Sequence, residues 1–290
     1  MFEINFDPNL FKKIFPAAAN LDVNIMRQIF LEKYADSGIA SSNGSFREYF
    51  VSDIQKYAEV HKKTVLEIGP FDNPLLRGTG VKYFDVMDKN SLDARAKKEG
   101  RQFDRTPFID FVHPEGDLRN ITEKFDICFS SHCIEHQVDL IGHLDSVFDL
   151  LDSGGRYCLI IPDKRFCFDY FFHESKLEEL IGAHWRQSSY HTYENILEHE
   201  CLLTHNDSLA HWLNQHGAVG NIKEKFKSVS CRLGDFTSEY KDVHAWRFTP
   251  KSFLKLMRDL ADLDLLRFSK CQVDLTPFPR QEFTAIFFKD

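Results

Sequence analysis

The chain has 290 residues, which suits one α/β domain of ordinary size with an elaboration. Hydrophobic residues make up 43% of it and charged residues 28%, and the net charge of -8 argues against nucleic-acid binding, which depends on clusters of Lys and Arg. No apolar run approaches the length of a membrane span, and the first residues lack the pattern of a secretory signal. We therefore expect a globular, cytoplasmic protein with no nucleic-acid partner and no membrane span.

The first part of the chain, residues 1–62, is expected to form an N-terminal helical segment. Apolar residues recur at helical spacing in 24–35 and again in 46–60, and a Ser/Gly-rich stretch at 37–45 separates the two helices. We expect this segment to pack at the edge of the main domain, residues 63–290.

Short apolar runs then alternate with helical patterns, which is typical of a parallel sheet covered on both faces. The first five strands are expected at residues 64–69, 81–86, 111–117, 124–131 and 156–162. An amphipathic helix at residues 140–151 precedes the fifth strand.

This rhythm breaks in residues 163–248, which are rich in His, Phe, Tyr and Trp and show only helical patterning. It returns in a helix with Thr249 as N-cap and Pro250 at its first position. Residues 265–273 and 282–289 are then expected to close the sheet as an antiparallel pair of strands. The predicted fold class is α/β: a doubly wound, mainly parallel seven-stranded sheet with N-terminal helices and a largely helical insertion after the fifth strand.

An acid and a glycine turn end the first expected strand, where Glu67 precedes Gly69 and Pro70. In doubly wound sheets the ligand lies at the carboxyl ends of the strands, and a glycine there lets the backbone approach the ligand because it has no Cβ. Asp85 ends the second strand, where a carboxylate can accept both ribose hydroxyls of a nucleoside cofactor. Asp88 is a rival for that role, although we favour its alternative interpretation as a helix N-cap.

Five segments in order resemble the class I (Rossmann-like) S-adenosylmethionine-dependent methyltransferases: VLEIGPFDNP (65–74), VKYFD (81–85), GDL (116–118), FDICFSSHCIEH (125–136) and SGGRYCLIIP (153–162). The loop after Gly69 departs from the glycine-rich signature and is similar to the EIGP-type loop of some members. A G-x-G-x-x-G turn and a Walker-type phosphate loop are both absent, which disfavours NAD and nucleoside triphosphates.

The resemblance implies S-adenosylmethionine as cofactor and S-adenosylhomocysteine as product. It implies that Asp117 accepts from the adenine amino group and that Leu118 lies against the adenine ring. It also implies that Ser130, Ser131 and His132 lie beside the methionine part of the cofactor. An ordinary exposed loop aspartate is the alternative for Asp117.

Three further segments, PDKRFCFDYF (162–171), THNDSLAHW (204–212) and DVHAWRFTP (242–250), resemble bacterial methyltransferases of surface-polysaccharide gene clusters. That resemblance implies a sugar-like or polysaccharide acceptor. It makes residues 163–248 an acceptor-binding insertion or lid.

Methyl transfer to a hydroxyl needs a base, and imidazole, with a pKa near neutrality, suits that task. The candidate bases are His136, His244 and His205, although any single histidine could instead be structural. The candidate acceptor contacts are Asp163, Lys164, Arg165, Asp169 and Trp246, with a surface charge cluster as the alternative for the first three. The insertion also offers His184, Trp185, Asp207, His211 and Trp212.

We expect no metal, since the spacing of His205, Asp207 and His211 matches no closed zinc pattern. The seven cysteines form no CxxC pair and are expected to be reduced core thiols.

The leading hypothesis is O-methylation of a sugar or glycan-linked group in bacterial surface-polysaccharide biosynthesis. The alternatives are a small non-sugar metabolite, a phosphate or phosphoramidate capsule decoration, and a catalytically silent scaffold that binds the cofactor. A small-molecule or glycan acceptor is the expected partner, with a homodimer as the candidate assembly.

Overall fold

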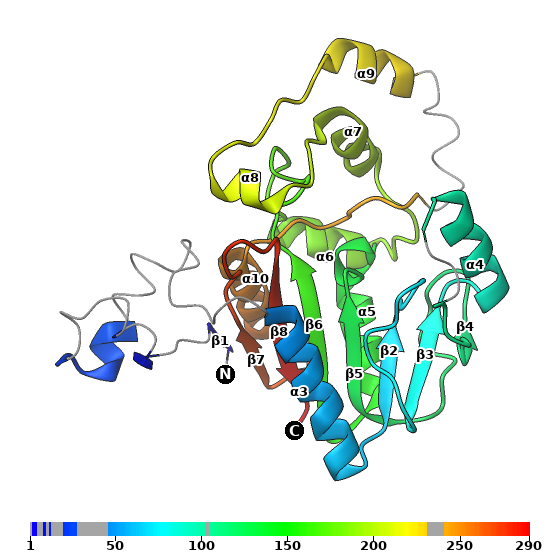
Figure 1. Ribbon diagram of the computed structural model, residues 1–290, viewed down its shortest axis with the longest axis vertical. Helices are drawn as coiled ribbons and strands as arrows, with labels where there is room; N and C mark the ends of the chain where they lie inside the picture. Colours follow the sequence, from blue (N-terminus) through cyan, green and yellow to red (C-terminus); the bar gives the residue numbers. More distant parts are fainter. Residues whose placement is uncertain are drawn as a thin grey trace.

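The computed structural model describes residues 2–4, 8, 9, 12, 20–27, 46–101, 105–230 and 241–290. The described residues form one sheet of eight strands in the order β1-β7-β8-β6-β5-β2-β3-β4 (Figure 1). The strands are β1 (Phe2–Ile4), β2 (Val65–Ile68), β3 (Val81–Asp85), β4 (Phe111–Val112), β5 (Phe125–Ser131), β6 (Leu151–Pro162), β7 (Lys270–Val273) and β8 (Glu282–Phe288).

Neighbouring strands are parallel except where β8 is involved, because β8 runs antiparallel to both β6 and β7. The seven predicted strands and their antiparallel closing pair are confirmed as β2 to β8. β1 adds an eighth strand, parallel to β7, with Phe2 opposite Cys271. The prediction that the N-terminal segment is helical is therefore wrong at Phe2–Ile4.

The helices outside the insertion include α3 (Phe46–His61), α4 (Lys89–Lys98), α5 (Leu140–Leu150), α10 (Pro250–Asp262) and the 3-10 turn η2 (Ile134–His136). Residues 23–27 are also helical, and they include the first residues of the helix predicted over 24–35. The rest of that helix and the predicted break at 37–45 lie outside the described residues.

Helices cover both faces of the sheet (Figure 1). On one face, Ile54 of α3 packs in a cluster with Ile127 and Phe129 of β5. Cys128 belongs to the larger cluster on the other face, which includes α5, α6 (Leu177–Trp185) and α10. Successive side chains of a strand point to opposite faces, so the middle of β5, residues 127–129, is apolar on both faces because both are buried.

The insertion contains α6 and, beyond it, α7 (Tyr193–Leu202), α8 (Ser208–Trp212) and α9 (Ile222–Ser230). These last three helices lie beyond the carboxyl ends of the parallel strands, and the return segment 241–249 crosses there (Figure 1). The insertion starts and ends at adjacent backbone positions, because Asp163 and Phe248 form a parallel bridge and Lys164 N donates to Phe248 O at 2.9 Å.

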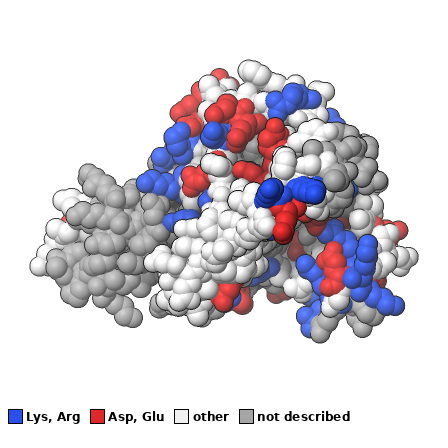
Figure 2. Space-filling view, turned by 90° about the horizontal axis from the view of Figure 1, so that it is seen from above, with Lys and Arg blue, Asp and Glu red and all other residues white. Residues whose placement is uncertain are grey.

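Among the described residues, no helix combines the length and the apolar character that crossing a membrane requires. The face seen in Figure 2 carries basic and acidic side chains close together rather than a continuous basic stripe. Six cysteines are free, five of them buried and Cys133 partly so, whereas Cys231 lies outside the described residues.

The strand order reverses between β2 and β5. From β2 the chain moves outward to β3 and β4, and it then returns to the other side of β2 through β5 and continues to β6. In open α/β sheets this reversal leaves a crevice outside the carboxyl ends of the two central strands. The residues that follow β2 and β5 are therefore where a ligand site is expected.

Candidate functional site

The carboxylate of Glu67 holds the loop that follows β2. It is 2% exposed, and its two oxygens accept hydrogen bonds from Leu75 N at 2.9 Å and Leu76 N at 3.0 Å. Burial raises the pKa of Glu67 to about 7 despite these hydrogen bonds. The acid at the end of the first predicted strand therefore fixes backbone, which sets the shape of the loop at the sheet edge.

Gly69 makes the turn out of β2. Its φ of +71° lies in the left-handed region, and a Cβ there would come 3.2 Å from the Cys133 sulfur. Pro70, the next residue, is buried, and Phe71 also has a positive φ of 47°. A turn that holds a non-glycine residue in this conformation is strained, as turns at binding sites commonly are.

Asp85 ends β3 beside this turn. Its carboxylate is largely buried and accepts from Val86 N at 2.7 Å and Phe71 N at 3.3 Å. Burial raises the pKa of Asp85. Met87 N is a third backbone donor to this carboxylate, and since a carboxylate has about four acceptor positions, about one remains for a ligand hydroxyl. Asp88, in contrast, caps α4 by accepting from Ser91 N at 2.8 Å, as its alternative interpretation expected.

The GDL segment lies near β4. Asp117 accepts from the Arg119 side chain at 2.9 and 2.8 Å, and the charge of this partner lowers the pKa of Asp117. Leu118 is 1% exposed and belongs to the large core cluster. The structure therefore gives Leu118 a core position and gives Asp117 an internal partner.

The residues predicted to contact the methionine part follow the end of β5. Ser130 Oγ lies 2.9 Å from the buried Tyr157 hydroxyl, whereas Ser131 Oγ accepts from Arg47 at 3.2 Å. His132 has a positive φ of 51°, and its Nε2 lies 2.6 Å from a carboxylate oxygen of Glu282. Ser131 and His132 thus lie at the carboxyl edge, while Ser130 is bonded within the core.

The return segment of the insertion is fastened to η2, directly after β5. Ala245 N and Trp246 N both donate to the backbone oxygen of Glu135, at 2.8 and 3.0 Å. Trp246 Nε1 donates to Gln137 O at 2.6 Å. These bonds fix the position of His244 against the η2 turn, although the two segments lie more than one hundred residues apart in the sequence.

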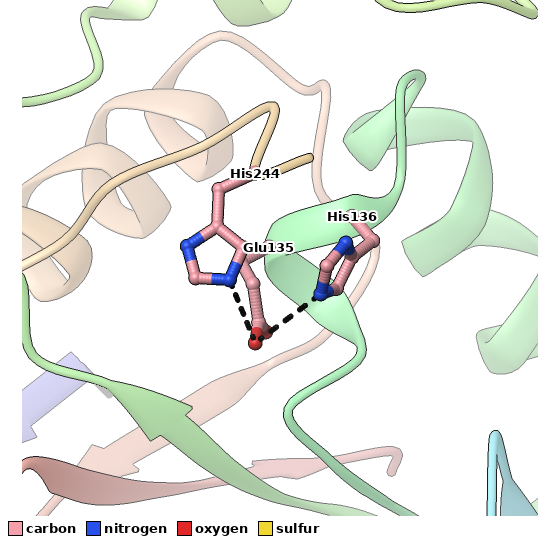
Figure 3. A group of neighbouring side chains, drawn as sticks. All are labelled: Glu135, His136 and His244. Atoms are coloured by element: carbon pink, nitrogen blue, oxygen red, sulfur yellow. Dashed lines mark ion pairs between the residues drawn. The ribbon is translucent and has the colours of Figure 1, made fainter. Parts of the chain in front are cut away.

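Glu135, His136 and His244 come together as a result (Figure 3). Nε2 of each histidine lies 3.9 Å from the same oxygen, Glu135 Oε1, and the two rings meet edge to face with centroids 4.8 Å apart. The structure thus brings together two of the three predicted bases and adds a carboxylate. We refer to these three residues as the Glu–His–His cluster.

The outer nitrogens of both rings have partners. His244 Nδ1 lies 2.5 Å from Asp169 Oδ2, and His136 Nδ1 lies 3.1 Å from Val243 O and 3.2 Å from Asp242 Oδ1. Burial lowers the pKa of His136. Burial also acts to lower the pKa of His244, but the charge and hydrogen bond of Asp169 outweigh it and raise that pKa.

The predicted acceptor residues after β6 are bonded within the protein. Asp163 is fully buried and accepts from Arg165 and from Thr276 Oγ1 at 2.6 Å. Lys164 Nζ donates to Tyr170 O at 3.0 Å. Asp169 supports His244, as described above. Trp246, also buried, supports the η2 turn.

His205 lies elsewhere in the insertion. Its Nε2 lies 2.8 Å from Gln215 O, and its ring stacks on that of His211 with centroids 4.4 Å apart. The Nδ1 atoms of His211 and His216 are 3.0 Å apart. Asp207, also noted in the sequence, caps α8 by accepting from Ala210 N. His205 is therefore part of a separate group of histidines.

Sequence reasoning did not nominate Glu135 or Asp242. Both lie inside quoted motifs, SSHCIEH and DVHAWRFTP, in which serines, histidines and a tryptophan were taken as candidates but neither acid was. The pairing of Glu135 with His136 directly after a strand was the available signal, but the burial of Glu135 is a property of the folded chain.

No protein-family model matches the chain, and no curated protein matches it in sequence. Among solved structures, it is similar to an S-adenosylmethionine-dependent methyltransferase from Clostridium acetobutylicum, with 12% identity over 52% of this chain and 62% of that one and a TM-score of 0.31. It is also similar to the glycopeptide N-methyltransferase MtfA in complex with S-adenosylhomocysteine, with 20% identity over 39% of this chain and 49% of that one and a TM-score of 0.27.

A third similar structure comes from Thermotoga maritima and is described as a methyltransferase and possible histamine N-methyltransferase. It matches with 15% identity over 84% of this chain and 98% of that one, at a TM-score of 0.37. The matched part spans less than two thirds of the first two proteins. All three TM-scores lie below 0.5. The functional assignment is therefore derived from the residues of this chain.

Proposed function

We propose that this chain is an S-adenosylmethionine-dependent methyltransferase whose cofactor binds at the carboxyl ends of β2, β3 and β5. One observation supports this most: two buried carboxylates, Glu67 and Asp85, flank the positive-φ turn at Gly69 where the strand order reverses. Asp85 keeps an acceptor position for a ribose hydroxyl, and Gly69 has no side chain to block the approach of the cofactor. The residues present therefore fit a nucleoside cofactor of this kind.

When bound, S-adenosylmethionine supplies an electrophilic methyl group on a sulfonium. Glu67 shapes the loop through Leu75 and Leu76, and Asp85 orients the ribose. The Glu–His–His cluster lies beside this edge, since Gly69 approaches Cys133, two residues before Glu135. Its carboxylate and its two inner nitrogens hold the acceptor hydroxyl and draw its proton away, as alignment and base catalysis require.

The finer proposal is O-methylation of a sugar or glycan-linked group during bacterial surface-polysaccharide biosynthesis in the cytoplasm. The aromatic side chains that the insertion leaves exposed, Trp185, Tyr190 and Tyr193, support a sugar acceptor, because they offer ring faces on which a sugar can stack. The rings of Phe166 and Trp212, and those of Tyr170 and His216, instead stack on each other, with centroids 3.8 and 3.6 Å apart. Arg165 and Lys164, the candidates for gripping a phosphate, are already bonded to Asp163 and Tyr170 O. A phosphate or phosphoramidate acceptor is therefore less well supported than a sugar.

Calorimetry with S-adenosylhomocysteine tests the cofactor proposal, and Asp85→Asn with Asp88→Asn gives a matched pair of variants. We expect Asp85→Asn to weaken binding by about 10- to 100-fold, because a hydrogen bond to a charged group contributes roughly 1.5–3 kcal/mol. Asp88→Asn should bind as the unmodified protein does, since asparagine caps a helix equally well. Absence of binding by the unmodified protein would refute every version of the proposal.

Turnover with a panel of nucleotide sugars and oligosaccharides tests the acceptor. Methyl transfer to members of this panel supports the sugar proposal, and transfer only to non-sugar metabolites contradicts it. Cofactor binding without any turnover identifies a scaffold instead. Sedimentation of the same samples tests the proposed homodimer.

A further inference from the structure

Glu135 is a buried acid without a hydrogen-bond partner. Its side chain is fully buried, and neither carboxylate oxygen has a hydrogen-bond partner among the described residues. An isolated buried carboxylate costs several kcal/mol, so such groups in proteins are paired or bind metal ions. The backbone around it is well fixed by Ala245 and Trp246, so the position of this carboxylate is set by the fold.

The two histidines each direct a free nitrogen at this carboxylate. In the neutral form of each ring, His244 Nδ1–H donates to Asp169 and His136 Nδ1–H donates to Val243 O, which leaves both Nε2 atoms as acceptors. Metal-binding histidines commonly have this arrangement, because a carboxylate or backbone carbonyl on the outer nitrogen fixes the tautomer and the orientation of the ring. Glu135 Oε1 and the two Nε2 atoms are then three hydrogen-bond acceptors that face one another, and such a group suits a cation.

The spacing of the ligand atoms fits one ion. One atom from each residue lies within 4.8 Å of the other two, and both Nε2–Oε1 distances are 3.9 Å. Ligand distances to a zinc ion are about 2.0–2.2 Å, so each side chain would move by less than about 1 Å to close around it. Asp169 and Asp242 lie behind the two histidines and add negative charge to the surroundings.

We propose that Glu135, His136 and His244 bind one divalent transition-metal ion at the carboxyl end of β5. Two imidazoles and one carboxylate select Zn²⁺ or a similar first-row ion over Mg²⁺ and Ca²⁺, which prefer oxygen ligands. Three protein ligands leave at least one position open, as in catalytic rather than structural sites. Cys133, two residues before Glu135, lies against the Gly69 turn, so the three ligands are close to the proposed cofactor edge.

The role of the ion rests on the proposed methyltransferase function, but its binding does not. In that function, the ion would take over the role given above to the three side chains: the acceptor hydroxyl would occupy the open position, and the positive charge would lower the pKa of that hydroxyl so that water can accept its proton as the methyl group is transferred. The metal-free alternatives are a protonated His244 shared between Asp169 and Glu135, and a protonated His132 shared between Glu282 and Glu135. They leave Glu135 Oε1 3.9 Å from His244 Nε2 and 3.8 Å from His132 Nδ1, and both distances are too long for a hydrogen bond.

Calorimetry on the full chain, freed of metal with a chelator, tests the site with Zn²⁺ and Mg²⁺ as separate probes. We expect one Zn²⁺ per chain and Mg²⁺ binding at least tenfold weaker. Glu135→Gln, His136→Gln and His244→Gln should each weaken Zn²⁺ binding tenfold or more. The controls Glu178→Gln and His173→Gln make the same chemical changes at exposed positions and should bind as the unmodified protein does.

A spectrum of the unmodified protein with Co²⁺ needs no variant to fold. We expect visible bands of a Co²⁺ ion with nitrogen ligands, which disappear when Zn²⁺ is added. Absence of tight Zn²⁺ binding, or binding that survives all three cluster substitutions, overturns the proposal. S-adenosylhomocysteine binding measured on the same samples distinguishes failure of the metal site from failure of the proposed function. Cofactor binding without Zn²⁺ binding refutes only the metal site. Zn²⁺ binding without cofactor binding refutes only the methyltransferase proposal.

Discussion

At the scale of single residues, Glu67 couples the shape of the loop after β2 to pH. Burial raises its pKa from 4.5 to about 7 in the folded chain. The folded protein therefore holds this proton more tightly than the unfolded chain does. The contribution of Glu67 to stability is largest below pH about 4.5, and it is lost as the pH rises towards 7.

Glu67→Gln should remove this dependence, because an amide is neutral throughout that range. As the pH rises from about 4.5 to 7, the unmodified protein should lose up to about 3 kcal/mol of unfolding free energy relative to the variant, since each unit of pKa shift corresponds to about 1.4 kcal/mol. Urea denaturation at several pH values measures the difference. The exposed control Glu178→Gln should follow the unmodified protein. A constant difference between Glu67→Gln and the unmodified protein would contradict the assignment.

The site residues differ in how far the sequence could predict them. Asp85 ends β3 and Glu67 lies one residue before the end of β2, and such positions near the end of an apolar run can be predicted from the sequence. Glu135 could not be found in this way, because its burial depends on the return segment at Ala245 and Trp246. Asp163 follows a strand as expected, but its bond to Thr276 joins residues that are distant in the chain.

At the scale of elements, α10 has the most complete local signal. Thr249 Oγ1 accepts from Ser252 N at 3.2 Å, the Ser252 side chain accepts in return from Thr249 N, and Pro250 occupies the first position. We expect Thr249→Ala to lower the free energy of unfolding by about 1 kcal/mol, since it removes the N-cap. Chemical denaturation measures this loss. Thr249→Ser, which keeps the hydroxyl, should stay within about 0.5 kcal/mol, and equal losses in both variants would contradict the capping role.

Elements with a regular apolar pattern were predictable, and those formed by distant pairing were not. β2, β5 and β6 appear as apolar runs because both faces of the sheet are covered. β1 has three residues and exists through its pairing with β7, more than two hundred and sixty residues later. Such a pairing has no local pattern, so that segment was predicted to be helical instead.

At the scale of the whole molecule, β8 joins the two ends of the fold. It pairs with both β6 and β7, and its Glu282 contacts Arg47 of α3 and His132 after β5. Deletion of residues 282–290 should therefore abolish cooperative unfolding, because it exposes one edge of β6 and separates β7 from the sheet. Thermal denaturation followed by circular dichroism tests this. Removal of Asp290 alone should leave the transition intact, and a cooperative transition in the longer deletion would contradict the prediction.

The backbone bridge between Asp163 and Phe248 closes an excursion of more than eighty residues at its base. The entropy lost on closing a loop grows slowly with its length, so such an excursion burdens the folding of the sheet little. This excursion could therefore be lengthened, shortened or exchanged while the carboxyl ends of β2, β3 and β5 stay the same, and under the proposed function such a change would alter the acceptor. His244 limits that freedom, because it lies inside the excursion four residues before Phe248. Any exchanged segment must still place an imidazole next to Glu135. The proposed acceptor specificity could therefore change only if the end of the return segment, at His244, keeps its position.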